Sequence, residues 1–505
     1  MTSAAFRRSL FLAAALAMLS PMVVLAQEDL AAQARSALLR AAHFWSGTVA
    51  SHGGYVWEYS TDLTTRRRGE SGDLPQTTNW VQAGTPMVGS ALLLSYAATG
   101  DAALLEAALA TGRCLAYGQL ESGGWHYSIE HDPQRVKHWY HHLGEAGKAL
   151  GNVTTFDDDN TQSATRFLIE LDRYVDDAEI SAAVARALDC FHRAQYRDGA
   201  WDGAWPQRYP PPKGTYSEFP TFNDGSMSDC LRTMLLAWDT YGRPEDEAAV
   251  RRCMEFYLRA QQPPPQAGWP QQVDRDLEPA WARRFEPPSV CGGESADNCN
   301  VLMDLAQRLN EPRCLDAVGR CVEWYRASRI GGTDERGTWA RFYELKTNRP
   351  LYFTRTYELT YDDKDLPLHY SFKSNYGVNA MIRRYEALRQ AGLQPAVEAL
   401  NPDERSPEAW KAAAAGLQER VKTAIETLDD QGRWVRRVPR REQTRDAQGR
   451  IGYSVDAARP LDMMYSNTTV TNLRALANYV IASRQGPAIT APRRLPPPPP
   501  LPARD

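Results

Sequence analysis

The sequence predicts an all-α protein of the α/α toroid class, in which helical hairpins form a full or incomplete ring with short β-strand loops at one end. Two observations support this class. Apolar residues recur at helical spacing in paired segments along most of the chain. A Gly-Trp loop or a close variant then follows a helix, roughly every 65–95 residues. A helical pair of this kind cannot bury its apolar face alone, so successive pairs are expected to stack on one another.

The helices expected from apolar spacing lie at residues 27–49, 83–98, 102–117, 162–175, 180–195, 226–241, 246–261, 315–326 and 407–428. The Gly-Trp loops lie at residues 123–127, 203–207, 268–271, 337–339 and 432–434. If the hairpins close into a ring, these loops gather at one end and line a cleft. The alternative is that the tryptophans belong to the core.

The chain is expected to divide into three parts. Residues 1–26 have the charged start, short apolar run and small final residue of a secretory signal. Residues 27–485 are expected to form the toroid, since a chain of 505 residues can build one large solenoid-like domain. Residues 486–505 are Pro-rich and are expected to be a disordered, extended tail. The Arg-rich stretch at residues 433–442 is interpreted as solvated surface.

The signal predicts that the mature protein is periplasmic or secreted. No other segment is apolar enough to cross a bilayer, so we expect the protein to be free of the membrane after cleavage. We also expect it to be a monomer. The even number of cysteines in an exported chain permits disulfides, and the pair Cys291–Cys299 is the bridge we expect. Cys114, Cys190 and Cys230 lie in helical patterns and are predicted to be buried thiols, as is Cys253.

Charge limits the possible partners. The formal net charge of −4 argues against a nucleic-acid partner. An acidic substrate would need Arg and Lys concentrated at one place, because the field of the whole protein does not attract it. The zinc-protease, serine-hydrolase, phosphate-loop and dinucleotide-binding motifs are all absent from the sequence.

The stretch from Trp201 to Cys230 suggests a sugar site. It holds Trp205 in a Gly/Pro-rich setting, then the basic turn around Lys213, then Asp224 before a predicted helix. Aromatic walls with a few placed polar groups are typical of ligand pockets. The alternative for Asp224 is an ordinary helix N-cap.

Three further stretches could carry chemistry. The run Asp157–Asp159 has more carboxylates than one helix cap needs, and calcium prefers such oxygen ligands. Asp274 and Arg283 lie in residues 268–294, where the alternative for Arg283 is a structural Arg–Glu ion pair. Residues 341–355 place arginines between aromatic residues, which suits an acidic polymer, the alternative being a solvated basic face over core aromatics.

Four segments in this order resemble the family 10 polysaccharide lyases, the pectate lyases of the pectic acid lyase superfamily. They are residues 157–168 (DDDNTQSATRFL), 203–227 (GAWPQRYPPPKGTYSEFPTFNDGSM), 278–295 (EPAWARRFEPPSVCGGES) and 341–355 (RFYELKTNRPLYFTR). The resemblance implies an α/α toroid that cleaves polygalacturonate by calcium-assisted anti β-elimination. After Pro350 the chain departs from the family, which usually has a shorter segment there.

The resemblance also implies roles for individual residues. Arg355 resembles the catalytic base, and Asp224 and Asp274 resemble the acidic residues that hold calcium. The residues that resemble substrate-binding positions are Arg283, Arg341, Arg349, Trp205, Lys213, Asn160 and Asn223. Two other functions remain open: a glycoside hydrolase using Asp158 and Asp224 as its acid and base, and a non-catalytic protein that binds oligo-uronates.

Overall fold

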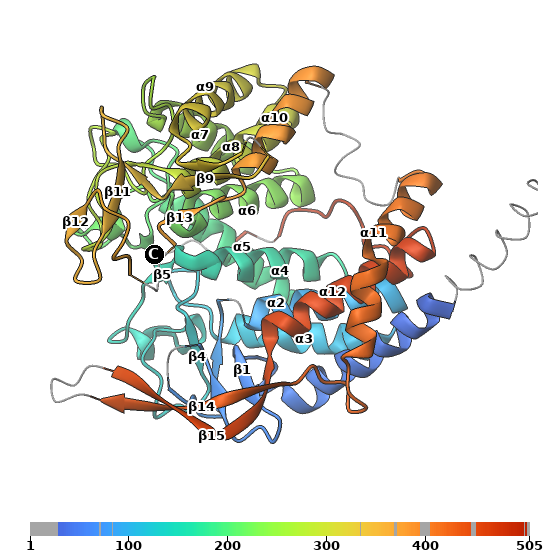
Figure 1. The fold of residues 1–505 in the computed structure, drawn as a ribbon. Helices are drawn as coiled ribbons and strands as arrows, with labels where there is room; N and C mark the ends of the chain where they lie inside the picture. Colours follow the sequence, from blue (N-terminus) through green and yellow to red (C-terminus); the bar gives the residue numbers. More distant parts are fainter. Residues whose placement is uncertain are drawn as a thin grey trace, which may run out of the picture. The chain divides into compact units, whose positions relative to one another are not determined.

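A computed structural model of the chain describes residues 29–69, 72–82, 84–333, 335–367, 371–393, 405–445, 451–498 and 500–501, without the side chains of residues 441–454. The predicted signal, residues 1–26, lies outside the described residues. Helical hairpins joined by short strands make up most of the described chain (Figure 1). This confirms the predicted class, an all-α protein of the α/α toroid class with short β-strand loops.

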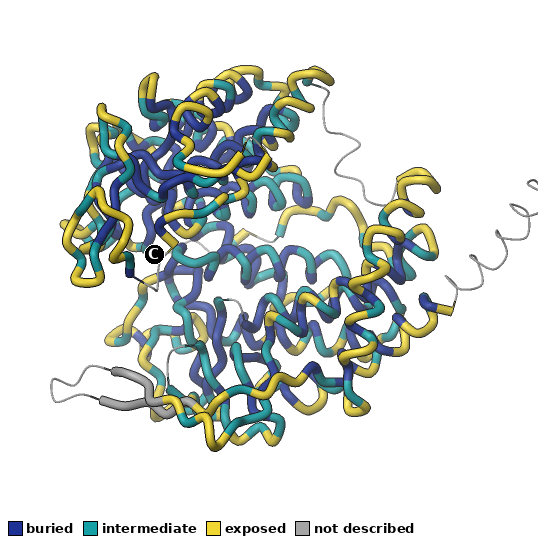
Figure 2. Tube along the Cα trace, viewed as in Figure 1, coloured by how far each residue is buried: buried dark blue, intermediate teal, exposed yellow. Residues whose placement is uncertain are grey.

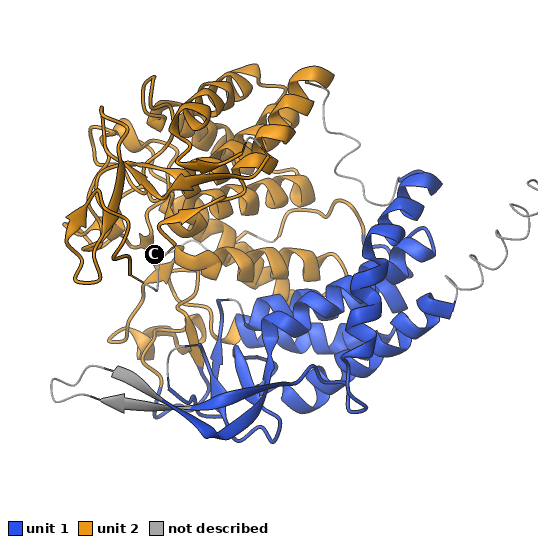
Figure 3. Cartoon of the chain, in the orientation of Figure 1, with its two compact units in different colours: residues 1–115, 130–135, 402–491 blue, residues 116–129, 136–401, 492–505 orange. Residues whose placement is uncertain are grey.

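Contacts divide the chain into two compact units (Figure 3). Unit 1 comprises residues 1–115, 130–135 and 402–491, and unit 2 comprises residues 116–129, 136–401 and 492–505. Each unit is described by itself. The single domain that we expect over residues 27–485 stays a prediction.

Unit 1 combines helices with one larger sheet. Residues 29–44 are helical and continue into the π-helical turn η1 (Trp45–Val49). Then follow α2 (Thr85–Thr99), α3 (Ala102–Tyr117), α11 (Pro407–Glu426) and α12 (Ser466–Ser483), and α12 packs on both α2 and α11 (Figure 1). The antiparallel sheet has the order β14 (Arg436–Arg445), β15 (Ile451–Tyr465), β1 (Glu58–Ser60), β2 (Arg66–Arg67). The short strand β3 (Thr78–Trp80) also belongs to unit 1, and β4 (Ser128–Glu130) contains residues assigned to both units.

The Arg-rich stretch at residues 433–442 is not simply a surface loop, because most of it forms β14. Arg436, Arg437 and Arg440 are exposed, as expected of a solvated basic stretch. The pairing with β15 shifts its register between Val438 and Arg440, where Pro439 cannot donate a ladder hydrogen bond. A strand interrupted by proline and dominated by arginine lacks the apolar alternation that sequence reasoning uses.

Unit 2 contains three successive hairpins and a further helix. The hairpins are α4 (Asn160–Asp172) with α5 (Ala178–Ala194), α6 (Ser226–Tyr241) with α7 (Pro244–Ala260), and α8 (Gly292–Leu309) with α9 (Pro312–Ser328), followed by α10 (Val378–Ala391). The first helices, α4, α6 and α8, lie side by side, and the second helix of each hairpin packs on its first. Buried residues follow these packed faces (Figure 2).

Short strands and turns precede the helices of unit 2. The sheet orders are β12 (Leu359–Thr360), β11 (Pro350–Phe353), β10 (Phe342–Tyr343), β7 (Val290–Cys291), then β13 (Lys373–Ser374), β9 (Gly337–Ala340), β8 (Gly331–Gly332), and the pair β5 (Thr154–Thr155), β6 (Arg208–Tyr209). The 3₁₀ turns are η2 (His141–Gly147), η3 (Asp157–Asp159), η4 (Gly199–Trp201), η5 (Tyr216–Glu218) and η6 (Asn223–Gly225). Thus η3 leads directly into α4 and η6 into α6.

A repeated glutamine contact joins consecutive hairpins. The Gln195 amide donates to the carbonyl oxygens of Gly203 in its own loop (3.0 Å) and Ala249 in α7 (2.9 Å). The Gln195 carbonyl oxygen accepts from the Arg252 guanidinium at 2.8 Å. The same arrangement occurs twice more, with partners Gly123, Ala183 and Arg186 for Gln119, and Ala267, Ala317 and Arg320 for Gln261. These contacts are independent support for the repeat inferred from the Gly-Trp loops.

The tryptophans of the Gly-Trp loops are core residues. Trp205 is only 1% exposed, and its indole N–H donates to the Phe191 carbonyl at 2.8 Å. The indoles of Trp269 and Trp339 likewise donate to carbonyls of the preceding helices, at 2.9 and 2.8 Å. The interpretation of Trp205 as an exposed sugar-binding platform is therefore wrong, because its ring fixes the loop to α5 instead.

The cysteine prediction is partly wrong. All eight cysteines are free and buried, so the expected Cys291–Cys299 bridge is absent. Cys291 lies on β7, where its thiol contacts Ser289, whereas Cys299 lies two turns into α8. Cys299 faces Cys321 of α9. Burial and the adjacent Cys299 thiol raise the pKa of the Cys321 thiol.

The Pro-rich tail contacts unit 2 at its start. The Leu495 amide donates to the Thr240 carbonyl at 2.9 Å, and the Arg173 guanidinium donates to the Pro492 carbonyl at 2.9 Å. This part of the expected disordered tail therefore packs on the helices. Within the described residues, no helix combines the length and apolarity needed to cross a membrane.

Candidate active site

Three carboxylates from two loops meet at the N-terminal ends of α4 and α6. One oxygen each from Asp157, Asp158 and Asp224 lies within 4.8 Å of the others. Asp157 and Asp158 belong to η3, and Asp224 belongs to η6. We call these three residues the acidic cluster. The positive end of a helix dipole favours negative charge at such a position.

The two loops have the same unusual backbone. Asp158 and Asp224 adopt left-handed conformations, with φ of 55° and 49°, and in each case the next residue is left-handed too. Non-glycine residues rarely adopt this region, although aspartate tolerates it better than most. The turns before α4 and α6 thus hold Asp158 and Asp224 at equivalent positions of two hairpin repeats.

Helix capping does not explain these aspartates. The N-caps of α4 and α6 are Asp159 and Gly225, and neither helix has a side-chain cap hydrogen bond. Asp159 instead pairs with Arg166 through both carboxylate oxygens, at 2.7 and 2.6 Å. The capping alternative for Asp224 is therefore wrong.

The acidic cluster is electrostatically unfavourable when all its members are ionised. Burial, and then the charges of Asp158 and Asp224, raise the pKa of Asp157 to about 6. Burial, and then Asp158 and Glu294, raise the pKa of Asp224 to about 6 as well. The buried Oδ1 of Asp157 has no hydrogen-bond partner within the described part of the chain. Tyr127 donates its hydroxyl to Asp158 Oδ2 at 3.0 Å.

Two arginines face the acidic cluster. The Nη2 atom of Arg283 lies 3.9 Å from Asp224 Oδ2, while its Nε and Nη2 atoms donate to the buried Glu286 at 2.9 and 2.5 Å. The Arg283 side chain is 42% exposed. Arg341 is more enclosed and donates from Nη2 to Glu294 Oε1 at 2.9 Å. Arg283 is thus the more accessible of the two to a ligand.

Asn223 connects Asp224 to Arg341. Its side-chain amide donates to Asp224 Oδ2 at 2.7 Å. Its carbonyl oxygen accepts from Arg341 Nη2 at 3.2 Å and from the Gln271 amide at 2.8 Å. Asn223 is 4% exposed, so we assign it to positioning the charged groups.

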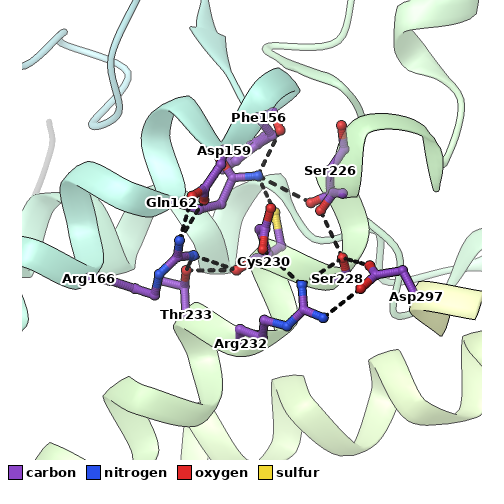
Figure 4. A network of polar contacts seen from close by, with 12 residues as sticks. Phe156, Asp159, Gln162, Arg166, Ser226, Ser228, Cys230, Arg232, Thr233 and Asp297 are labelled. Carbon is purple, nitrogen blue, oxygen red and sulfur yellow. Dashed lines mark hydrogen bonds and ion pairs between the residues drawn. The ribbon is translucent and has the colours of Figure 1, made fainter. Parts of the chain in front are cut away.

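A second polar network lies along α4, α6 and α8 below the two loops (Figure 4). The buried Gln162 amide donates to the carbonyls of Phe156 (2.7 Å) and Ser226 (3.2 Å), which links the η3 loop to the start of α6. Further along, Arg232 pairs with Asp229 of α6 and Asp297 of α8, at 3.0 and 2.7 Å. These contacts fix the separation of the helices that carry the acidic cluster.

A family model described as pectic acid lyase matches residues 119–381. The chain belongs to the pectic acid lyase family. It is a polysaccharide lyase. The three aspartates of the acidic cluster lie inside the matched range, as do Arg283 and Arg341.

Solved structures similar to this lyase include a family 10 polysaccharide lyase from Cellvibrio cellulosa, in a variant in complex with trigalacturonic acid. That match has 23% identity, covers 61% of this chain and 98% of the other, and has a TM-score of 0.45. A D-mannose isomerase matches with 11% identity, 61% and 73% coverage and a TM-score of 0.42. An α-1,6-mannanase from Salegentibacter sp. HEL1_6 matches with 11% identity, 90% and 99% coverage and a TM-score of 0.39. No curated protein matches the chain.

Several residues predicted for the lyase site lie elsewhere or are buried. Asp274 is not in the acidic cluster, because its Oδ1 accepts from the backbone amides of Asp276 and Glu278, at 2.9 and 3.0 Å. Asn160 is fully buried and donates to the Trp125 carbonyl at 3.1 Å, a contact that fixes a loop. Both side chains bond to backbone groups, and their roles in the lyase stay predictions.

The remaining predicted residues are exposed and lie apart from these contacts. Arg355 pairs with Asp365 at 3.2 Å, both side chains being largely exposed. Arg349 stacks on the ring of Tyr361, 3.5 Å from its centroid. Lys213 lies in an exposed turn. Their roles in the lyase stay predictions.

Sequence reasoning missed Tyr127 and Glu294 as site residues. The repeat contained a usable signal for Tyr127, which follows Trp125 by two positions, as Gln271 follows Trp269 and Arg341 follows Trp339. All three side chains reach the acidic cluster or the residues bound to it. Glu294 gave no such signal, since its role depends on how β7 and β10 pair.

Proposed function

We propose that this polysaccharide lyase is exported and cleaves polygalacturonate by calcium-assisted anti β-elimination. The observation that carries the proposal is the placement of the acidic cluster opposite Arg283 and Arg341 within one compact unit. A carboxylate-bearing sugar could be held there by arginines on one side and a cation on the other.

The chemistry of the acidic cluster suits calcium. Calcium prefers several oxygen ligands and tolerates irregular geometry. Asp157, Asp158 and Asp224 supply such oxygens within 4.8 Å of one another. Asp157 Oδ1 has no hydrogen-bond partner among the described residues, and the pKa values of Asp157 and Asp224 are raised, so a cation bound here would stabilise the ionised carboxylates. When bound, calcium would withdraw charge from the uronate carboxylate and so acidify the neighbouring C5–H bond.

The arginines would act on the same sugar. In β-elimination a base takes the proton from C5, the C–H electrons form the C4–C5 double bond, and the C4 oxygen leaves. We assign carboxylate binding to Arg341 and the position of the base to Arg283, because Arg283 is both exposed and adjacent to Asp224. To act as the base, the Arg283 guanidinium would first release one proton to solvent and then take the proton from C5. Arg355, which the family resemblance favours, is the competing assignment and is tested against Arg283 below.

The test is incubation of the purified protein with polygalacturonate, with calcium or with a chelator. New ultraviolet absorbance from an unsaturated product, seen only with calcium, is expected. New reducing ends without that absorbance would assign hydrolysis, with Asp158 and Asp224 as the acid–base pair. Binding without any cleavage would leave a non-catalytic uronate-binding protein.

A further inference from the structure

A cavity lies in unit 2, among the strands that follow α9. It has a volume of about 580 Å³, within the usual range for a ligand pocket. Its lining includes Thr338, Arg349, Tyr352, Tyr361, Asp363 and Lys373. None of these residues belongs to the acidic cluster or to the side chains that contact it.

The strands fix the groups that line this cavity. Lys373 lies on β13, opposite Ala340 of β9, and Arg349 directly precedes β11. Tyr361 follows β12 and donates its hydroxyl to Glu344 Oε1 at 2.5 Å, which holds the ring in place. Much of the lining thus comes from the segment after Pro350.

One cation of the cavity is available to an anion. Lys373 forms an ion pair with Asp363, whereas Arg349 has the Glu344 carboxylate nearby but forms no ion pair with it among the described residues. The Arg349 guanidinium is stacked on Tyr361, 3.5 Å from the ring centroid. Stacking orients a guanidinium while its edge N–H groups stay available for bidentate binding of a carboxylate.

Other groups of the cavity suit a sugar. Tyr361 is 47% exposed and offers an aromatic surface, and the Asp363 carboxylate can accept from sugar hydroxyls. A neutral sugar would not need the guanidinium of Arg349, and a simple anion would need no aromatic surface. The combination is the one expected for an acidic sugar.

We propose that this cavity binds a uronate residue of the polysaccharide, outside the catalytic site, and so adds affinity for long substrates. The proposal rests on the proposed function, because it takes the same class of polymer as ligand. A second contact on one polymer makes binding at both sites more favourable than at either alone.

The test measures binding of polygalacturonate by affinity electrophoresis, using the full chain in an Asp224→Asn background to suppress cleavage. Arg349→Ala and Tyr361→Ala are expected to weaken binding by about threefold to tenfold, the range for one exposed charge-assisted contact. The matched control is Arg389→Ala, since Arg389 also lies over a tyrosine ring, that of Tyr385, but does not line the cavity. Neutral galactan serves as the uncharged polymer.

Binding by the Arg349→Ala variant equal to that of the control would overturn the proposal. So would an equal loss of affinity for galactan, because the cavity would then not read the carboxylate. If the unsubstituted protein makes no unsaturated product but Arg349→Ala still weakens uronate binding, the proposed function fails and the cavity proposal stands. If the unsubstituted protein cleaves polygalacturonate but the cavity variants bind it normally, the proposed function stands and the cavity proposal fails.

Discussion

Asp224 is held in a left-handed conformation, beside two other carboxylates and opposite Arg283. Its neighbours raise its pKa to about 6, because burial and like charges both oppose ionisation. When Asp224 is ionised and no cation is bound, it lowers the stability of the folded state. A bound cation would make its ionised form favourable. The cation-ligand role that we propose for Asp224 and its cost to stability therefore have one origin.

Asp224→Asn tests that origin, since asparagine tolerates the same backbone conformation. Without calcium, the variant is expected to unfold at a higher temperature, because the repulsion with Asp158 is removed. Its calcium affinity is expected to fall by about two orders of magnitude, as one charged ligand is lost. Calorimetric titration with calcium and thermal unfolding in chelator measure the two effects. A variant that binds calcium normally would place the cation elsewhere.

A second residue-scale prediction separates the two candidate bases. Arg283→Ala is expected to lower kcat/KM by about a thousandfold, in the range for loss of a general base. Arg355→Ala is expected to cost about tenfold or less, because Arg355 is paired with Asp365 in an exposed position. Initial rates on polygalacturonate with saturating calcium provide the comparison, with Arg389→Ala as the control. A larger loss of kcat/KM in Arg355→Ala than in Arg283→Ala would assign the base to Arg355.

The residues of the site differ in how readily a sequence reveals them. Arg283, Arg341, Asn223 and Asp224 come from contiguous motifs, and the structure brings all four together. Trp205 was misread, because a sequence does not show whether an aromatic ring faces the core or a ligand. Contacts made through packing of separate repeats, such as that of Glu294 with Arg341, leave no local pattern.

At the scale of elements, the glutamine contacts between hairpins are expected to be a main source of stability in unit 2. The buried Gln195 amide satisfies carbonyls of its own loop and of α7, and its oxygen satisfies Arg252. Gln195→Ala leaves these groups without their partner and is expected to lower the free energy of unfolding by about 2–4 kcal/mol. Denaturant unfolding measures the change.

Gln33→Ala is the matched control, because Gln33 is exposed and, among the described residues, its side chain bonds only to Asp29 one helical turn away. It is expected to change the free energy of unfolding by less than about 0.5 kcal/mol. If the Gln195→Ala variant is as stable as this control, the glutamine contacts do not contribute to the free energy of unfolding.

Regular apolar spacing decides which helices could be predicted from the sequence. The helix predicted at residues 226–241 matches α6, and that at 102–117 matches α3, because their apolar spacing is regular. α8 was missed, since it begins with Gly292 and Gly293 and carries many polar residues. α12 was missed too, because its run of Thr and Asn obscures the start of the apolar pattern.

At the scale of the whole molecule, calcium and pH are expected to act together on stability. The folded-state pKa values of Asp157 and Asp224, about 6, exceed their ordinary value of 3.8. The folded protein therefore binds more protons than the unfolded chain between about pH 4 and pH 6, and these two groups destabilise it as the pH rises through that window. Calcium binds the ionised carboxylates and offsets this loss above about pH 6.

The measurable result is the calcium-induced rise in Tm as a function of pH. It is expected to be large at pH 7 and small at pH 5, where protons compete for the same oxygens. Thermal unfolding in calcium and in chelator across this range gives the profile, and the Asp224→Asn variant should flatten it. An equal calcium effect at both pH values would contradict binding at the acidic cluster.

The contacts of Gln119, Gln195 and Gln261 set the pitch of the scaffold through main-chain carbonyls and not through the identity of the loop side chains. Loop composition and length are thereby uncoupled from the positions at which the helices start. The segment between β11 and α10 can therefore be long while the starts of α4, α6 and α8 keep their places. A change in the length of such a loop is expected to leave the spacing of these helices unchanged.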